Sequence, residues 1–119
     1  MAKAGNKPEN LKPYVRLSIG TADGEGGSMF GKGIADLCLG VRKLGSLNAA
    51  AKSMHMAYSK AWRIMKETEA AFGIQLLIRD GAHGSTLTDA GNQLLDTYLK
   101  VNEAASTYAE KLYAEVIHA

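Results

Sequence analysis

A proline-free stretch at the C-terminal end, residues 88–118, constrains the fold of this chain more than any other feature of its sequence. Thr88 is a favourable helix N-cap, and Asp89 places a negative charge in the first turn, where the helix dipole favours it. A helix of about thirty residues spans about 45 Å. The sequence therefore predicts one long, uninterrupted helix over residues 89–119.

Apolar side chains recur along this helix at alternating spacings of four and three residues, as in a coiled-coil seam. The seam consists of Leu94, Tyr98, Val101, Ala105, Tyr108 and Leu112. A second apolar row contains Leu95, Leu99, Tyr113 and Ile117. A small domain cannot cover both rows of so long a helix, so we predict a homodimer that pairs through residues 89–119. The alternative is a helix that folds back on its own domain.

Residues 45–66, GSLNAAAKSMHMAYSKAWRIMK, predict two helices joined by a tight turn. Ser46 is a natural N-cap for the first helix, and the second begins near Ala57 or Tyr58. The side chains expected between the two helices are small, namely Ala50, Ala51 and Ala61. Small side chains let two helices cross closely, as a helix-turn-helix requires. Trp62 is predicted to lie in the core.

The flanking segments predict a hairpin and a helix before this stretch and a second hairpin after it. Residues 13–20 alternate apolar and polar side chains as a strand does, and residues 28–30 predict its partner across a glycine-rich turn. Residues 34–44 carry apolar side chains at i, i+3, i+4 and i+7, which predicts an amphipathic helix. Residues 74–80 and 85–87 predict the two strands of a hairpin, or wing, with a glycine-containing tip.

Charge is distributed unevenly along the chain. Residues 40–88 hold seven basic and three acidic side chains, hence +4, whereas residues 89–119 hold two basic and five acidic, hence −3. The total of +2 hides this asymmetry. A basic middle and an acidic end are expected if one surface meets phosphates and another meets protein, and ordinary scatter of charge is the alternative.

A helix-turn-helix with a basic second helix predicts binding to double-stranded DNA, because a helix fits the major groove and its first turns reach base edges. Side chains of the first helix and of the wing are candidates for contacts with backbone phosphates. The predicted DNA-binding residues are Ser46, Lys52, Tyr58, Ser59, Lys60, Arg63, Arg79 and His83. Among them, Ser59, Lys60 and Arg63 are the natural candidates for base or phosphate contacts from the second helix.

These elements together predict an α+β fold that is mainly helical, a winged helix-turn-helix with an N-terminal β-hairpin and a long C-terminal dimerisation helix. We place a flexible N-terminal tail at residues 1–12 and the winged helix-turn-helix DNA-binding domain at residues 13–88. The dimerisation helix occupies residues 89–119.

The stretch from residue 45 resembles the DNA-binding domain of molybdate-responsive, ModE-type transcription regulators. Their pattern is a Gly-Ser pair, a pair of alanines and then Met-Ser-Tyr-x-x-Ala-Trp. The positions that fit are Gly45, Ser46, Ala50, Ala51, Met56, Tyr58, Ala61 and Trp62. The likeness extends back to residues 30–33 and forward to residues 87–95, and it covers residues 13–115. LysR-type regulators share GS-x-x-AAA and LT-x-AG-x-x-LL, and both types imply a winged helix-turn-helix that regulates transcription.

The sequence departs from the ModE pattern in three places. Ala57 stands where the family usually has serine, which removes a helix cap and a phosphate contact. The wing sequence, DGAHGS, is closer to the LysR length. ModE-type regulators carry C-terminal molybdate-binding domains, whereas this sequence stops after the long helix, so we expect neither oxyanion sensing nor a cofactor. A separate sensor or effector protein could supply the signal.

Other chemistry has little support in the sequence. Residues 26–33, GGSMFGKG, nearly match the phosphate-binding loop G-x-x-x-x-G-K-[ST], but Gly33 replaces the hydroxyl residue that would hold Mg²⁺. The three histidines are scattered and Cys38 has no spaced partner, so neither a zinc site nor a catalytic triad is expected. A single thiol, no signal peptide and no membrane-length apolar run favour a cytoplasmic protein that is not an enzyme.

The alternative function is a winged-helix module that binds protein rather than DNA. A charge of +4 in the middle of the chain is modest for a DNA-binding surface. The acidic, heptad-patterned end is an interaction surface in its own right. Retention on duplex DNA at low salt distinguishes the two functions, because only phosphate neutralisation produces it.

Overall fold

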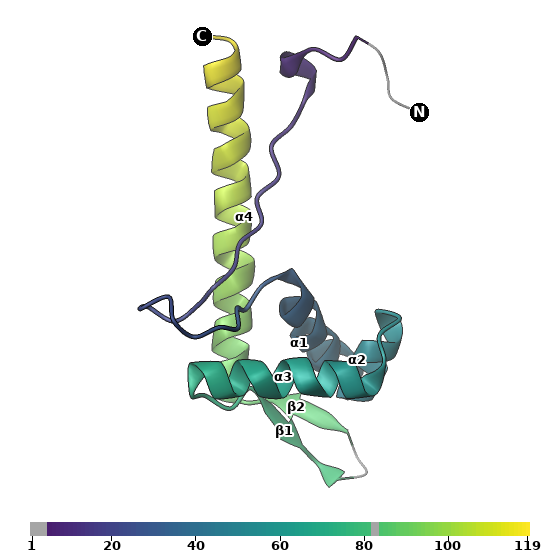
Figure 1. The fold of residues 1–119 in the computed structure, drawn as a ribbon. Helices are drawn as coiled ribbons and strands as arrows, with labels where there is room; N and C mark the ends of the chain where they lie inside the picture. The colour runs from purple at the N-terminus through teal and green to yellow at the C-terminus, as the bar shows by residue number, and fades with distance from the viewer. Residues whose placement is uncertain (1–4, 82–83) are drawn as a thin grey trace.

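From residue 32 onward, the helices and strands follow one another in the order that the sequence predicts. The computed structural model describes residues 5–81 and 84–119. Its elements are a 3-10 helix η1 (Pro8–Asn10), helices α1 (Lys32–Leu44), α2 (Leu47–Ser53), α3 (Tyr58–Phe72) and α4 (Asp89–Ile117), and strands β1 (Leu77–Arg79) and β2 (Ser85–Leu87). Helices α1, α2 and α3 pack together with the β1–β2 wing on one side, and α4 rises out of this body (Figure 1). The predicted winged helix-turn-helix fold is confirmed.

Local capping explains where the helices begin and end. The side chain of Ser46 accepts a hydrogen bond from the Ala49 amide at 2.9 Å, and Thr88 Oγ1 accepts one from the Gly91 amide at 2.9 Å. Gly45 ends α1 with φ 79° and Gly73 ends α3 with φ 67°, and this left-handed conformation favours glycine. These four signals lie in the sequence itself, which is why the predicted helix boundaries are close to those observed.

Small residues bring α1, α2 and α3 close together, as expected from the alanines of the middle stretch. Ala50, Ala51 and Ala61 are fully buried. A Cβ added at Gly40 of α1 would lie 2.6 Å from the Cβ of Ala50, so α1 also contributes a small residue to this contact. The largest fully buried side chains around it are Phe30, Leu37, Leu47, Met65, Leu76 and Leu95.

The wing is a short antiparallel hairpin fixed to the body at its base. Its register pairs Leu77 with Leu87 and Arg79 with Ser85. The strand predicted over residues 74–80 covers 77–79 only. The Leu76 amide donates to a carboxylate oxygen of Glu69 at 2.7 Å, and the Leu76 carbonyl accepts from the Thr88 amide at 3.0 Å. The Leu76 amide is therefore bonded to α3, whereas its carbonyl is bonded to Thr88, the residue that follows β2.

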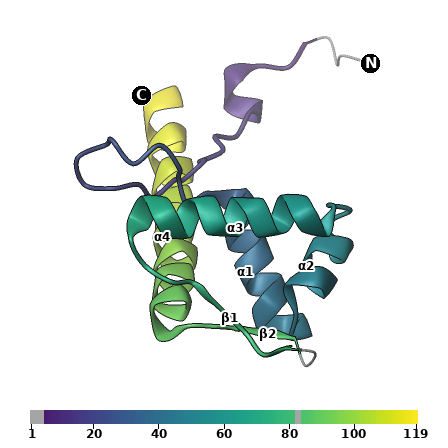
Figure 2. The ribbon, with the colours of Figure 1, turned by 60° about the horizontal axis from the view of Figure 1, so that its bottom comes forward.

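The prediction of an N-terminal β-hairpin is wrong. In the structure, Ile19 and Phe30 pair in a single isolated bridge, and no ladder of strand pairs extends from it in residues 5–31. Thr21 Oγ1 donates to Asp23 and accepts from the Gly26 amide, so the glycine-rich loop bonds within itself instead of extending a ladder. Residues 13–18 run along α4 instead (Figures 1 and 2). The alternation of side chains was a sound signal for one buried face, but that face packs against a helix.

Residues 8–12 also lie against α4, whereas the sequence predicts a flexible tail over residues 1–12. The Tyr113 hydroxyl donates to the Pro8 carbonyl at 2.6 Å, and Lys12 Nζ lies 3.0 Å from a carboxylate oxygen of Glu110. Residues 1–4 lie outside the described part of the chain. This N-terminal arm, residues 8–19, packs along the second apolar row of α4, in which Tyr113 and Ile117 are half-buried. The chain thus covers part of this row by itself, whereas Leu99 of the same row is 38% exposed.

The predicted seam of α4 divides between the core and the surface. Tyr98 is 6% exposed and packs edge-on against Phe30, with ring centroids 5.7 Å apart, so it belongs to the core of its own chain and not to an exposed seam. Leu94 is partly buried against the same core. Val101, Tyr108 and Leu112 are 45%, 65% and 42% exposed. The exposed part of the seam therefore begins at Val101.

Cys38 lies in the core, and burial raises the pKa of its thiol to about 12. At pH 8 the thiolate is then about one part in ten thousand of the native population, and thiol reagents attack the thiolate. We expect Cys38 to resist a chromogenic disulfide reagent in the native chain and to react at once in guanidinium chloride. Rapid labelling of the native chain, measured by absorbance at pH 8, would contradict this burial.

Candidate nucleic-acid interface

Helix α3 presents one polar face away from the body. Ala61, Met65 and Thr68 are buried on its inner side. Three of the predicted DNA-binding residues, Ser59, Lys60 and Arg63, are exposed on its outer side. The inner spacing of four and three residues fixes this orientation, because it places one stripe of the helix against the core. A row of donors and positive charges therefore faces solvent along the first two turns of α3.

The Arg63 side chain is only loosely held by its neighbour. Its Nη1 lies 3.5 Å from a carboxylate oxygen of Glu67, one turn further along α3. Both side chains are more than half exposed, and exposed pairs of this kind contribute little to stability. The guanidinium of Arg63 can therefore exchange this partner for a base edge or a phosphate at small cost.

The predicted DNA-binding residues at the two ends of α2 differ in how far their side chains are exposed and available for hydrogen bonds. Ser46 is half-buried and its hydroxyl oxygen accepts from the Ala49 amide, so its side chain caps α2. Lys52 is exposed in the last turn of α2. Ala57 is the N-cap residue of α3 and offers no side-chain hydrogen bond, as its departure from the ModE pattern implies.

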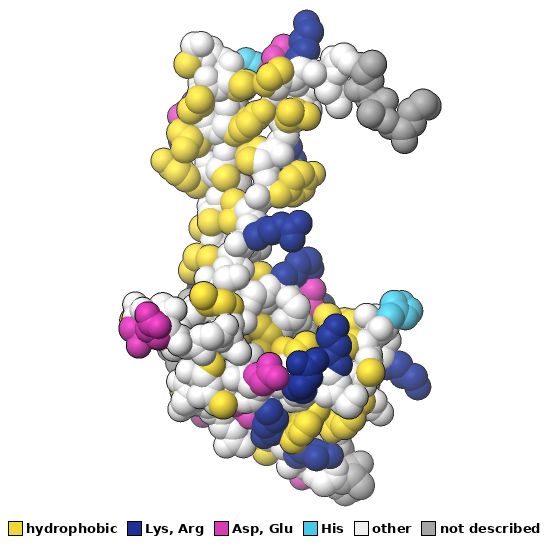
Figure 3. Space-filling view, viewed as in Figure 1, with side chains coloured by type: hydrophobic (Ala, Val, Ile, Leu, Met, Phe, Trp, Pro, Cys, Tyr) yellow, Lys and Arg dark blue, Asp and Glu magenta, His cyan; other side chains and the backbone are white. Residues whose placement is uncertain are grey.

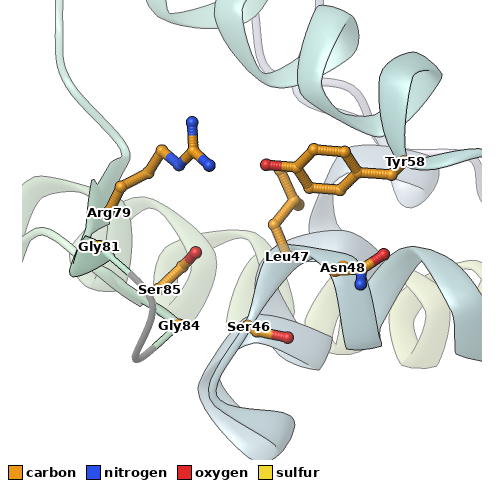
Figure 4. Close-up of a pocket in the computed structure, with 8 residues that line it drawn as sticks. All are labelled: Ser46, Leu47, Asn48, Tyr58, Arg79, Gly81, Gly84 and Ser85. Atoms are coloured by element: carbon orange, nitrogen blue, oxygen red, sulfur yellow. The ribbon is translucent and has the colours of Figure 1, made fainter.

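A cavity of about 390 Å³ lies where the starts of α2 and α3 meet the wing. Its lining residues are Ser46, Leu47, Asn48, Tyr58, Arg79, Gly81, Gly84 and Ser85. The side chains of Arg79 and Tyr58 point toward each other across it from the wing and from α3 (Figure 4). The structure thus brings together three predicted residues, Ser46, Tyr58 and Arg79. Predicted His83 lies outside the described residues.

Trp62 is half-buried at the edge of the core, whereas the sequence predicts it inside. Two cations lie against its indole ring. Lys66 Nζ is 4.5 Å from the ring centroid and Arg79 Cζ is 4.9 Å from it. The pairing of Trp62 with Arg79 depends on where the wing packs against α3, so the spacing of residues in the sequence could not show it.

Basic side chains gather over α3 and the wing in the space-filling view (Figure 3). The exposed ones from α2, α3 and β1 are Lys52, Lys60, Arg63, Lys66 and Arg79. In residues 5–81 and 84–119, no group of three or more His, Cys, Asp or Glu side chains is placed to hold a metal ion. Within the same residues, no helix is both long enough and apolar enough to cross a membrane. The exposed basic side chains of α2, α3 and β1 give this surface the positive charge that a polyanion would meet.

Comparison with known proteins finds a matching family for the middle of the chain. Residues 36–92 match the family described as bacterial regulatory helix-turn-helix protein, lysR family. Among curated proteins, no sequence match is found. The solved complex of the DNA-binding domain of CbnR with DNA is 29% identical, with a TM-score of 0.59, and the match covers 70% of this chain and 94% of that chain.

Two longer regulators share the same fold. CbnR itself, a LysR family transcriptional regulator, is 30% identical with a TM-score of 0.55, over 68% of this chain and 28% of that chain. VV2_1132, also a LysR family transcriptional regulator, has a TM-score of 0.52 at 23% identity, over 61% and 25% of the two chains, and shows the fold alone. The chain thus spans little more than a quarter of the length of CbnR. Residues 36–92 thus match the LysR helix-turn-helix family, and the chain has a winged helix-turn-helix fold like that of LysR DNA-binding domains.

Proposed function

We propose that this chain is a transcription regulator that binds double-stranded DNA with α3 and the wing. One observation carries the proposal: basic side chains gather over α3 and the wing (Figure 3). Ser59, Lys60 and Arg63 are exposed in the first turns of α3, and Arg79 of the wing lines the same cavity as Tyr58 of α3. A helix with donors in its first turns fits the major groove, and the wing then lies along the backbone. The likeness to the DNA-binding domain of CbnR, solved with DNA, supports DNA binding.

The predicted residues then take different roles. Ser59, Lys60 and Arg63 read base edges or meet phosphates from the first turns of α3. Tyr58 and Arg79 face a backbone phosphate at the cavity between α3 and the wing. Lys52 meets a neighbouring phosphate, and the amides of α2 that begin at Ser46 favour negative charge. His83 remains a candidate, from the sequence alone, for a contact with the duplex backbone.

We also propose that two copies pair through the exposed part of the α4 seam. Val101, Tyr108 and Leu112 are large apolar side chains in contact with solvent, at spacings of seven and four residues. A coiled-coil partner would bury them together. A dimer places two copies of α3 on one face, which implies a pseudo-palindromic operator. The Tyr58-x-x-Ala61-Trp62 motif supports a ModE-like variant of this domain, with its signal supplied by a separate protein.

Selection of bound sequences from a random duplex pool tests the proposal directly. We expect two inverted half-sites with a fixed spacing. Affinity for the selected site should fall linearly in log–log form with salt, with a slope of about −0.9 for each neutralised phosphate. A chain that is not retained on any duplex at low salt would instead act as a protein-binding module.

Replacement of Arg63 by alanine should weaken binding to the selected site by about 1–3 kcal/mol if Arg63 reads a base. The matched control is Glu67→Gln, which releases Arg63 from its loose ion pair and should leave affinity unchanged or slightly higher. Fluorescence anisotropy with the selected site and with single-base variants measures both. Unchanged affinity and unchanged base preference in Arg63→Ala would remove Arg63 from the recognition surface.

A further inference from the structure

We infer that Trp62 is a positioning residue for DNA binding, which holds the guanidinium of Arg79 at the edge of the cavity between α3 and the wing. The inference rests on the proposed DNA binding and assigns a role to a residue that does not itself face the groove. It also commits the cavity to one occupant, a phosphodiester of the DNA backbone.

The geometry around Arg79 is that of a stacked cation. Arg79 is the last residue of β1, next to the wing tip, and its side chain is exposed. In the described part of the chain, no carboxylate oxygen lies within 4.0 Å of its guanidinium nitrogens. Its Cζ lies 4.9 Å from the Trp62 ring centroid instead. An aromatic face attracts a guanidinium without using its N–H donors, so these donors remain free for a phosphate.

Trp62 can position Arg79 because its own side chain is fixed by contacts with the core and with Lys66. The Trp62 side chain is partly buried against the core, and Lys66 Nζ lies 4.5 Å from the ring centroid. Lys66 also lies 3.1 Å from a carboxylate oxygen of Glu69. The other carboxylate oxygen of Glu69 accepts from the amides of Leu76 and Leu77 at 2.7 and 3.1 Å. Glu69 thus fixes the start of β1 to α3, and Trp62 fixes its end.

The position of Arg79 suits an anion in the cavity. Figure 4 shows its guanidinium directed into the space opposite the Tyr58 hydroxyl. Asn48 and Ser85 line the same cavity, so hydrogen-bond donors approach it from α2, α3 and the wing. A free arginine side chain has many rotamers, and their restriction opposes binding. Stacking on Trp62 removes part of that loss before the DNA arrives.

A double-mutant cycle on the selected duplex tests this assignment. Trp62→Leu keeps an apolar side chain against the core but removes the aromatic face, whereas Trp62→Tyr keeps a face. We expect Trp62→Leu and Arg79→Ala each to weaken binding roughly tenfold and to lower the salt slope by about one. The double variant should be no weaker than either single variant, and Trp62→Tyr should bind nearly as the parent chain does.

The assignment would be overturned if the fold losses of DNA affinity in the two single variants multiplied in the double variant. An unchanged salt slope in Trp62→Leu would also overturn it. Either result would leave the proposed DNA binding intact. A parent chain that binds no duplex would fail the proposed function instead. One readout needs no DNA, because Trp62 is the single tryptophan of the chain. In Arg79→Ala, acrylamide should quench its fluorescence more strongly than in the parent chain, and equal quenching would show that Arg79 does not cover the ring.

Discussion

Leu112→Glu should convert the proposed dimer into monomers and weaken binding to a two-half-site operator by about a hundredfold or more. Leu112 is half-exposed in the seam of α4, so a carboxylate there is well solvated in a monomer. In a dimer the same carboxylate would be buried opposite an apolar surface, which costs far more than the pair can recover. Loss of one copy removes the second half-site, and linked binding sites typically contribute about 10²–10⁴ in affinity.

Thr107→Glu is the matched control for this change. It adds the same side chain to the same helix, at an exposed position on the opposite side from Leu112. We expect it to remain dimeric with unchanged operator binding. Light scattering and anisotropy on one- and two-half-site duplexes measure both variants. If light scattering still shows a dimer for Leu112→Glu, the two copies pair through another surface.

Gly91→Val should destabilise the chain by about 3 kcal/mol or more, although valine is the better helix former. A Cβ at position 91 would lie 2.5 Å from the carbonyl oxygen of Leu76. That oxygen belongs to the backbone and accepts from the Thr88 amide, so it cannot turn aside as a side chain would. The first turn of α4 would have to move away from the wing.

Gly33→Val provides the comparison, because nothing lies within 4 Å of a Cβ built at Gly33 in α1. We expect its stability to be unchanged within about 0.5 kcal/mol. In a domain of about 100 residues each kcal/mol shifts the melting temperature by about 4–8 °C, so calorimetry separates the two variants easily. A Gly91→Val chain as stable as the parent would show that α4 does not pack this closely on the wing.

The sequence predicted those parts of the fold that depend on neighbouring residues. Ser46 and Thr88 cap the helices that follow them, and Gly45 and Gly73 end the helices before them, because each signal acts within one turn. Partners that are distant in the sequence were harder to identify. The alternation of residues 13–19 indicated a buried face but not that α4 covers it.

The candidate site divides in the same way. The outward face of α3 follows from helical periodicity, so Ser59, Lys60 and Arg63 could be predicted as exposed. The contact between Trp62 and Arg79 could not be predicted without knowing where the wing lies relative to α3. The same holds for Asn48, which lines the cavity only because the wing packs beside α2. Tyr98 lies where the two apolar rows of α4 meet, and periodicity alone cannot decide whether a core or a partner covers such a position.

The joint between α4 and the body has a mechanical consequence. Thr88 donates from its hydroxyl to the Gln75 carbonyl at 2.6 Å, and Arg42 of α1 binds Asn92 at 2.8 Å and Asp96 at 2.8 Å. These bonds hold α4 in a fixed orientation relative to the body. In a dimer joined through α4, a rotation of one α4 helix against the other would turn both α3 helices with it. The crossing angle of the two α4 helices would therefore set which operator spacing the dimer can span.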